Sequence, residues 1–297
     1  MFKVLALALS GLCATATQAA AFNFCDRPST LTAQQQDRLL QFSAVVRREL
    51  EASGQSVALI SRSGLDLHRF GIRYSHAGVS LKASENTPWS VRQLYYACDE
   101  RRPRLFDQGL AGFLFGTDDP TVGYVSIQLM PTDAAAAVEQ AALDKPRALR
   151  LLAATYSANA YPQSLRYQNC NQWVAELLAA AWGGLEDGDD LRARAQAWLA
   201  GESYAPPAVE VGAPWVLWAG YFIPWIHYDD HPAGDVAALR LHTSLPTAIE
   251  AFVRTRLPAA KHIELCHTEQ QMVIRRNGPP VAEGCKPEPG DEVLTLD

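Results

Sequence analysis

"RYQNCNQWVAELLAAAW", residues 166–182, is the stretch that decides the fold predicted for this chain. From Cys170 onwards, apolar side chains recur every three or four residues, which predicts an amphipathic helix with one buried stripe. Asn169 suits the N-cap, because its side-chain oxygen can accept from a first-turn amide, and Gly183 with Gly184 ends the helix. Cys170 shares its stripe with Trp173, Val174, Leu177, Leu178, Ala181 and Trp182.

The position of Cys170 allows two interpretations. In the first turn, unpaired amides and the positive end of the helix dipole favour a thiolate and lower its pKa, and the same amides can stabilise an oxyanion. Against this, free cysteine is among the most buried residue types, and one on an apolar stripe is more often a core residue. A nearby base would favour the nucleophile.

The first 21 residues have the features of a secretory signal peptide. Lys3 supplies the positive charge, an apolar run follows, and three alanines at 19–21 precede Phe22 as a cleavage site. We therefore expect a soluble protein that is exported to the periplasm or secreted. No later segment has enough uninterrupted apolar residues for a transmembrane anchor.

Composition excludes several classes of partner. Without the signal peptide the chain carries 25 basic and 32 acidic residues, which makes it a poor ligand for nucleic acid or anionic lipid. The arginine-rich stretch 97–109 also contains acidic residues and is predicted to be a solvated loop. The glycines of 109–116 lack the context of a phosphate loop, so this stretch is predicted to be an ordinary loop. "HYDDH" at 227–231 is typical of loop polarity, so we expect no cofactor and no metal.

Five cysteines remain after cleavage, and an odd number leaves at least one unpaired within the chain. Cys266 and Cys285 flank a predicted strand and turn, so a bridge between them would close a short local loop. Cys25 could then pair with Cys98, which leaves Cys170 free. Other pairings are open.

The order of predicted elements is mixed α+β, without an internal repeat. Two long strands at 70–82 and 89–99 are separated by a turn composition and should form an antiparallel hairpin. Further strands are expected at 56–64 and 123–130, helices at 30–54, 131–143, 145–157, 189–203 and 244–257, and a second hairpin at 262–278.

His76 is the candidate base. It lies in the strand at 70–82, and the small residues Ala77 and Gly78 that follow leave room for another element to approach. Strand alternation places His76 on one face and Ala77 on the other. A helix packed across this sheet could bring Cys170 to His76.

These two stretches resemble a known superfamily. "SHAGVSL" at 75–81 is similar to the histidine strand, and "NCNQWVAELL" at 169–178 to the nucleophile helix, of NlpC-type papain-like cysteine hydrolases. His76 precedes Cys170 by 94 residues, which resembles the circularly permuted branch that includes YiiX-like and lecithin-retinol-acyltransferase-like proteins. The catalytic match covers roughly 56–185, and the whole chain resembles an exported bacterial family with only a domain-of-unknown-function label.

The resemblance implies a third polar residue on the strand after the histidine strand, just before an alanine. Tyr96, ahead of Ala97, takes that place, where the family commonly has Glu, His or Asn. Counting along the hairpin agrees, because His76 should face Tyr95 or Tyr96. The alternatives at this position are Asp99 and Gln93, and both tyrosines also suit a β-sheet as ordinary aromatic residues.

The resemblance also implies the fold and the activity. We expect a permuted papain-like core at 22–240, with an antiparallel sheet packed on the nucleophile helix, and a small α+β extension at 241–297. Cys170 would attack an acyl carbonyl while His76 moves the proton, as in an amidase, peptidase, thioesterase or acyltransferase acting on an envelope peptide, peptidoglycan or lipid acyl group. The alternative is a non-catalytic envelope binding or structural protein with a degenerate site.

A tryptophan-rich segment follows the predicted helices. Positions 214–225 hold three tryptophans, a tyrosine and a phenylalanine, broken by Pro214, Gly220 and Pro224. Such a segment could wall a cleft for a lipid, glycan or peptide, although aromatics so placed are more often core. The breaks exclude a membrane-spanning helix.

Overall fold

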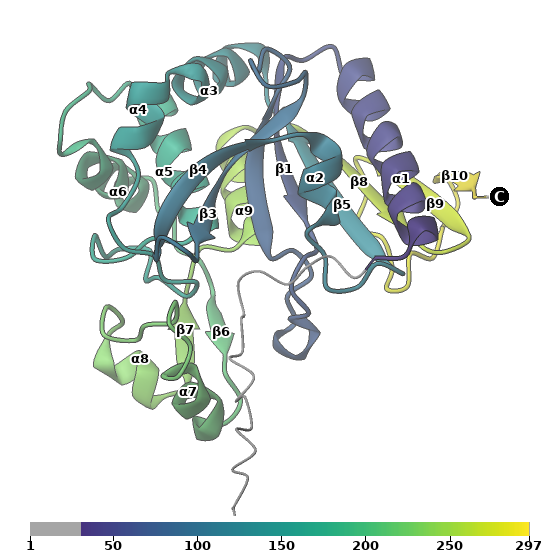
Figure 1. Ribbon diagram of the computed structural model, residues 1–297. Helices are drawn as coiled ribbons and strands as arrows, with labels where there is room; N and C mark the ends of the chain where they lie inside the picture. Colours follow the sequence, from purple (N-terminus) through teal and green to yellow (C-terminus); the bar gives the residue numbers. More distant parts are fainter. Residues whose placement is uncertain (1–30, 297) are drawn as a thin grey trace, which may run out of the picture.

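The computed structural model describes residues 31–296 and shows a mixed α+β fold built on one eight-stranded sheet (Figure 1). The strand order is β10-β9-β8-β5-β1-β2-β3-β4, and every neighbouring pair is antiparallel. The strands are β1 (Val57–Arg62), β2 (His76–Leu81), β3 (Ser90–Ala97), β4 (Arg102–Gln108), β5 (Gly123–Leu129), β8 (Lys261–His267), β9 (Gln271–Arg276) and β10 (Glu292–Thr295).

Helices cover both faces of this sheet, so its central strands are buried on both sides. In β1, Ala58 and Ile60 pack with the helices α1 (Ala33–Ala52) and α2 (Leu110–Phe115). Val57 and Leu59 point the other way, into a core with the remaining large helices. These are α3 (Thr132–Leu143), α4 (Lys145–Arg150), α5 (Cys170–Trp182), α6 (Leu191–Gly201) and α9 (Pro246–Arg256).

The predicted helices begin where their sequence signals place them. Thr32 caps α1 with a capping box that it shares with Gln35, and Asn169 caps α5 by accepting from the amide of Gln172. The predicted hairpin is also confirmed, because β2 pairs with β3 in an antiparallel register.

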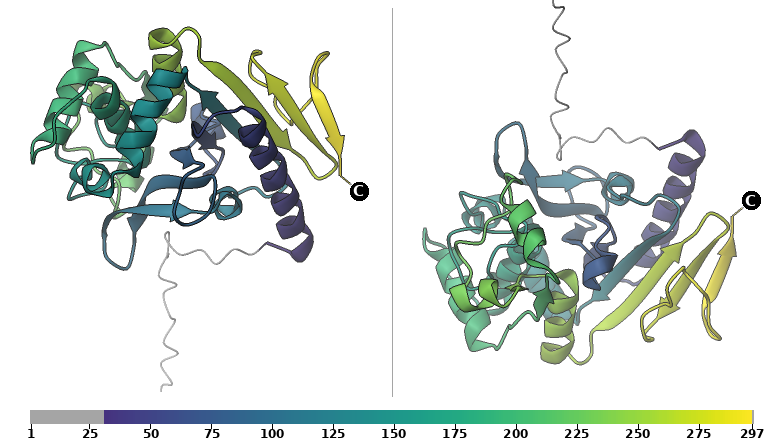
Figure 2. Two further views of the ribbon diagram at one scale, coloured as in Figure 1. Left: turned by 90° about the horizontal axis from the view of Figure 1, so that it is seen from above. Right: turned by 90° about the horizontal axis from the view of Figure 1, so that it is seen from below.

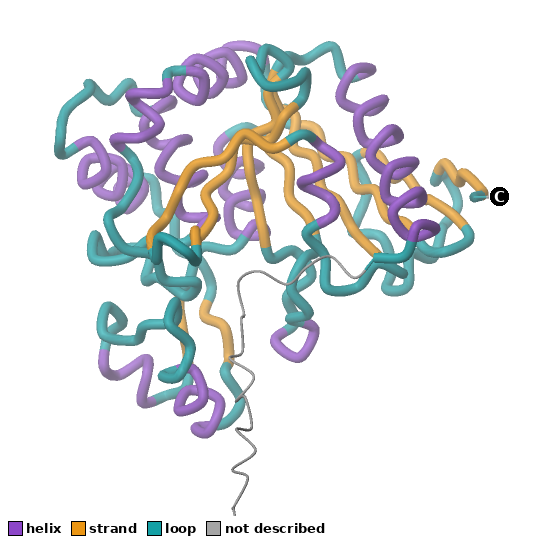
Figure 3. The backbone as a smooth tube through the Cα atoms, in the orientation of Figure 1, coloured by secondary structure: helices purple, strands orange, loops and turns teal. Residues whose placement is uncertain are grey.

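A small second unit stands below the main body in the view of Figure 1. It consists of the two-stranded sheet of β6 (Ala208–Glu210) and β7 (Arg240–His242) with α7 (Pro214–Gly220) and α8 (Ala233–Ala237). The tube view shows that this unit and the loop of the short 3₁₀ helix η1 (His68–Phe70) both project from the same end of the main sheet (Figure 3).

Two predicted loops are wrong, and the helix predicted at 145–157 is also wrong in its second half, because α4 ends at Arg150. The stretch 97–109, expected to be a loop, contains the edge strand β4, and 109–116, also expected to be a loop, contains α2. In β4 the exposed side chains of Arg102 and Arg104 alternate with less exposed ones. Exposed charges of this kind are typical of an edge strand, where they prevent pairing with a strand of another molecule. In α2, Phe113 and Leu114 are buried under α1, so tertiary packing stabilises a helix of only six residues.

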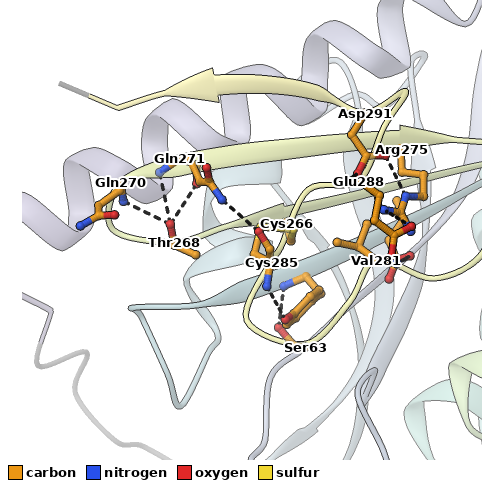
Figure 4. Close-up of a disulfide and its surroundings, with 12 residues drawn as sticks. Ser63, Cys266, Thr268, Gln270, Gln271, Arg275, Val281, Cys285, Glu288 and Asp291 are labelled. Carbon is orange, nitrogen blue, oxygen red and sulfur yellow. Dashed lines mark hydrogen bonds and ion pairs between the residues drawn. A yellow bond between two sulfur atoms is a disulfide. The ribbon is translucent and has the colours of Figure 1, made fainter.

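The C-terminal segment continues the main sheet. The expected extension 241–297 contributes β7, α9 and three strands, and β8 pairs along its whole length with β5 (Figure 2). The predicted Cys266–Cys285 disulfide is confirmed, with a Cα–Cα distance of 5.6 Å. Next to it, the Gln271 side chain donates to the Cys285 carbonyl, and Arg275 pairs with Asp291 (Figure 4).

The predicted N-terminal features lie outside the described residues. These are the signal peptide at 1–21 and Cys25, the expected partner of Cys98. Cys98 itself is disulfide-bonded. Within residues 31–296, no helix combines the length and the apolar composition needed to cross a bilayer.

Candidate functional site

Cys170 begins α5 and opens onto a cavity. The Asn169 side chain accepts from the Gln172 amide at 2.6 Å, which fixes the first turn and with it the thiol. Cys170 is the free cysteine of the described chain, as predicted, and it is 8 % exposed. It therefore combines a sheltered position with access to an internal space.

The cavity has a volume of about 1200 Å³ and lies at the end of the sheet where β1 stops and β2 starts. Cys170 and His76 both line it, together with Arg62 and Tyr156. Its other walls come from the loop around η1 and from the small unit of β6, β7 and α7. Apolar side chains dominate those walls, among them Leu67, Ile72, Val211, Leu217, Ile223 and Trp225.

His76 is held by a chain of two amides on the neighbouring strands. Its Nε2 lies 2.7 Å from Oε1 of Gln93, and Nε2 of Gln93 donates to Oε1 of Gln108 at 2.6 Å. The Gln93 oxygen can accept a hydrogen bond from the ring only if Nε2 carries the proton. This arrangement leaves Nδ1 of His76 unprotonated and available as a base.

Asn171 ties the cysteine helix to the histidine strand. Its side-chain oxygen accepts from the Ala77 amide at 2.9 Å, and its side-chain nitrogen donates to the Ser75 carbonyl at 3.2 Å. Asn171 thus hydrogen-bonds to the backbone on both sides of His76. Sequence reasoning missed Asn171, although its place next to the cysteine was a signal.

Cys170 and His76 reach the cavity from different faces of the sheet. The α5 helix packs on the face that carries Ala77, whereas His76 points to the face of α2, where its ring lies 6.0 Å from that of Phe113. Among the described residues, no hydrogen bond joins the Cys170 thiol to the His76 ring. Catalytic hydrogen bonds are often long in unliganded sites and shorten when substrate binds.

Burial dominates the protonation of both groups. It raises the pKa of the Cys170 thiol to about 11, although the first-turn amides, the Tyr156 hydroxyl and the Arg62 charge all act to lower it. It also lowers the pKa of His76 to about 3, with the Arg62 charge acting in the same direction. Of the two interpretations of Cys170, a low-pKa thiolate is therefore the less favoured, because desolvation outweighs the helix amides. The resting pair is neutral.

The candidates for a third catalytic residue lie in different places. Tyr95 packs on His76 with ring centroids 4.6 Å apart, and Gln93 makes the hydrogen bond. Tyr96 points to the opposite face, where it contacts the rings of Tyr156 and Trp225. Asp99 is exposed in the turn after β3. The structure brings Gln93, one of the alternatives, to the imidazole.

Two further residues at the site escaped sequence reasoning. The Tyr156 hydroxyl hydrogen-bonds the Cys170 thiol, and burial holds the pKa of Tyr156 well above its usual value. Arg62 is 4 % exposed at the end of β1. The only sequence signal for Arg62 was its charge at the end of a mostly apolar predicted strand. Tyr156 offered no signal, because the sequence predicts a helix at 145–157 where the structure has a loop.

The tryptophan-rich segment forms part of the cavity wall. Trp215 and Trp225 line the space, although Trp215 is also largely exposed, and Trp218, Tyr221 and Phe222 are exposed without lining it. Of the two interpretations of this segment, the structure shows the wall of a cleft. Within residues 31–296, no group of three or more His, Cys, Asp or Glu side chains is arranged to hold a metal ion.

Comparisons with known proteins place the chain in a family. No curated protein matches it, and no solved structure does. A family model described as an uncharacterized protein conserved in bacteria, DUF2145, matches residues 49–253. That range includes β1 to β7, the cysteine helix and the whole of the small cavity-walling unit. The chain belongs to the DUF2145 family.

Proposed function

We propose that this protein is an exported thiol hydrolase or acyltransferase that acts on an acyl or amide bond through Cys170 and His76. The observation that carries the proposal is the shared cavity, which is lined by a free thiol at a helix start and by an imidazole with one oriented nitrogen. The likeness of the two sequence motifs to permuted papain-like hydrolases supports the same assignment. In this proposal the side-chain amide of Gln93, which contacts His76, plays the role that asparagine plays in papain-like sites.

The chemistry follows from the atoms that face the cavity. As the Cys170 sulfur bonds to the acyl carbon, its proton moves to Nδ1 of His76, and the carbonyl oxygen becomes an oxyanion. The unpaired amides of the first turn of α5 can stabilise that oxyanion. The oxyanion then collapses, the leaving group takes the proton from His76, and an acyl-thioester remains on Cys170. Water or another acceptor, deprotonated by His76, releases the acyl group.

The neutral resting pair determines how the reaction starts. With a thiol pKa of about 11 and an imidazole pKa of about 3, neither group ionises alone at neutral pH. Proton transfer must therefore accompany attack on the substrate. Gln93 supports this transfer because its Oε1 accepts from the imidazolium as the charge forms.

The apolar walls indicate the acyl group. A space of about 1200 Å³ lined mainly by aliphatic and aromatic side chains accommodates a medium or long acyl chain. The test is turnover of 4-nitrophenyl esters of increasing chain length by wild type and Cys170→Ala. We expect wild type to hydrolyse octanoate faster than acetate and Cys170→Ala to show only background. Equal rates for the two proteins would refute the thiol mechanism.

A second function is favoured by the protonation of the same site. A neutral thiol and a neutral imidazole in a large apolar cavity also suit a protein that binds an apolar ligand without reacting with it. That envelope binding protein would hold octanoate esters intact, and its affinity would be the same in Cys170→Ala. Burst release of nitrophenol by wild type separates the two, because only the enzyme releases it.

A further inference from the structure

We propose that Arg62 binds a carboxylate of the substrate through its unpaired edge, so that the protein acts on acyl compounds that carry a free carboxylate beside the scissile bond. This inference rests on the proposed function for the position of the scissile bond. The carboxylate site itself is independent of catalysis. It is carried by the contacts of one buried guanidinium.

Arg62 has donors that no group of residues 31–296 uses. It donates from Nη1 to the carbonyls of Ser63 and Gly116 and from Nη2 to the Tyr95 hydroxyl at 2.6 Å. A guanidinium has five N–H donors, so these three bonds leave two, Nε–H and one on Nη2. Nε is buried and has no partner. Nε and Nη2 flank one edge of the guanidinium, the fork that binds the two oxygens of a carboxylate.

Two glycines make room for the guanidinium. A Cβ added to Gly64 would lie 2.3 Å from Nη1 of Arg62, and a Cβ added to Gly116 would lie 2.4 Å from Nη2. The Phe113 ring packs 5.2 Å from the guanidinium carbon. Any larger residue at either glycine would displace the charge, so the chain holds Arg62 in a fixed position on the cavity wall.

The other buried arginines show what is missing at Arg62. Arg92 pairs with Asp107, Arg192 with Glu176, and Arg275 with Asp291. Within the described residues, no carboxylate lies in ion-pair distance of Arg62. A buried charge normally requires a partner, and the cavity that Arg62 lines is the place from which a ligand can supply one.

A carboxylate at this edge would also prepare the base. Arg62 lies opposite His76 on the neighbouring strand and lines the same cavity as Cys170, and its charge helps to lower the pKa of both groups. Neutralising this charge with a bound carboxylate would raise the proton affinity of His76. Substrate would thus improve the base that its own cleavage requires.

The ligand class follows from the two kinds of wall. The apolar lining takes an acyl chain, and the fork takes a carboxylate close to the thiol. An N-acyl amino acid has both parts, a fatty acyl amide and a free α-carboxylate next to it. Its amide carbonyl would face Cys170.

The test compares two probes that differ only in charge, N-octanoylglycine and N-octanoylglycinamide. Calorimetric titration of the full-length protein should give a preference of about tenfold or more for the acid, since a hydrogen-bonded charge pair is worth roughly 1.5–3 kcal/mol. Arg62→Gln should remove the preference, and Arg62→Lys should retain part of it, because lysine keeps the charge but lacks the fork.

Arg47→Gln serves as the control, because Arg47 is an exposed arginine on α1 that does not line the cavity, and its replacement also removes one positive charge. It should leave the preference unchanged. Circular dichroism of each variant checks folding. If Arg62→Gln does not fold, Arg62→Lys is the variant that tests the proposal. A wild type that binds both probes equally, or an Arg62→Lys variant that matches wild type, would overturn the proposal.

Two further titrations distinguish a carboxylate site from a failure of catalysis and from a phosphate site. Cys170→Ala should keep the preference for the acid, so failure of catalysis and failure of the carboxylate site give different results. Octyl phosphate is titrated in parallel. Tighter Arg62-dependent binding of octyl phosphate than of N-octanoylglycine would assign the fork to phosphate and overturn the carboxylate proposal.

Discussion

The first turn of α5 and its middle differ in how their polar groups are satisfied. In the middle, the buried carboxylate of Glu176 accepts from Arg192 at 3.0 Å and from Gln196 at 2.8 Å, and it also accepts from Gln168 and Gln172. In the first turn, Cys170 and His76 stay neutral beside a guanidinium that keeps unused donors.

This difference separates groups that hold the fold from groups that await a ligand. The Glu176 network joins α5 to α6 and to the loop before α5, with every charge compensated inside the protein. The cavity groups lack that compensation, although they are equally buried. Evolution tolerates such unsatisfied groups mainly where function requires them.

The largest effect should come from breaking the structural region. Glu176→Gln leaves Arg192 buried without an opposite charge, so we expect the free energy of unfolding to fall by about 3–5 kcal/mol. Arg62→Gln removes a charge that has no ionic partner in the described part of the chain, and it should cost about 1–2 kcal/mol, the value of its hydrogen bonds. Urea unfolding measures both. Equal losses would remove the distinction between the two regions.

A smaller effect should follow when the imidazole of His76 loses its hydrogen bond to Gln93. Gln93→Leu removes the acceptor on Nε2 of His76, so the ring no longer favours the tautomer with a free Nδ1, and kcat should fall about 100-fold. Tyr96→Phe is the control on the same strand and should change kcat less than twofold. Should Tyr96→Phe prove the more damaging variant, the third group would be Tyr96, as the sequence resemblance implies.

The pH dependence of alkylation sharpens the assignment of a neutral thiol. Since the thiolate is the reactive form and the pKa of Cys170 is about 11, the rate with iodoacetamide should rise about tenfold per pH unit from pH 7 to pH 10. Arg62→Gln removes a charge that favours the thiolate and should move the curve to higher pH. A plateau reached below pH 8 would show a thiolate–imidazolium pair instead.

Stability in acid depends on two buried histidines. The pKa of His76 is about 3 in the folded state and that of His267 about 4, both below the usual histidine value because of burial. The unfolded chain therefore binds more protons between pH 6.5 and pH 3, and stability falls as pH falls through this range. Each histidine contributes a slope of up to about 1.4 kcal/mol per pH unit.

The variant His76→Asn isolates that contribution. The free energy of unfolding is measured from pH 7 to pH 4. In this variant its slope against pH should be lower by the contribution of one histidine, up to about 1.4 kcal/mol per pH unit. An unchanged slope would mean that His76 is not held neutral.

The sequence was informative where local signals govern structure. The caps of α1 and α5, the β2–β3 hairpin and the Cys266–Cys285 bridge follow from patterns within a few residues or from short loops. The edge strand β4 and the helix α2 do not, because charges mask the strand and packing under α1 stabilises the helix.

The site shows the same limit. Cys170 and His76 could be named from their own stretches, but Arg62, Tyr156 and Asn171 act through contacts that only the fold creates. Periodicity also could not tell that α5 covers the face of Ala77, so that His76 enters the cavity from the other side.

The central claim is that Cys170 becomes acylated by substrate with His76 as its base. The most direct measurement is intact-mass spectrometry of the protein quenched in acid shortly after mixing with 4-nitrophenyl octanoate. We predict one octanoyl group on wild type, mapped to Cys170, with its formation slowed at least about 100-fold in His76→Ala, the usual value of a general base. Octanoylation at the same rate in Cys170→Ala, or none in wild type that releases nitrophenol, would contradict the account.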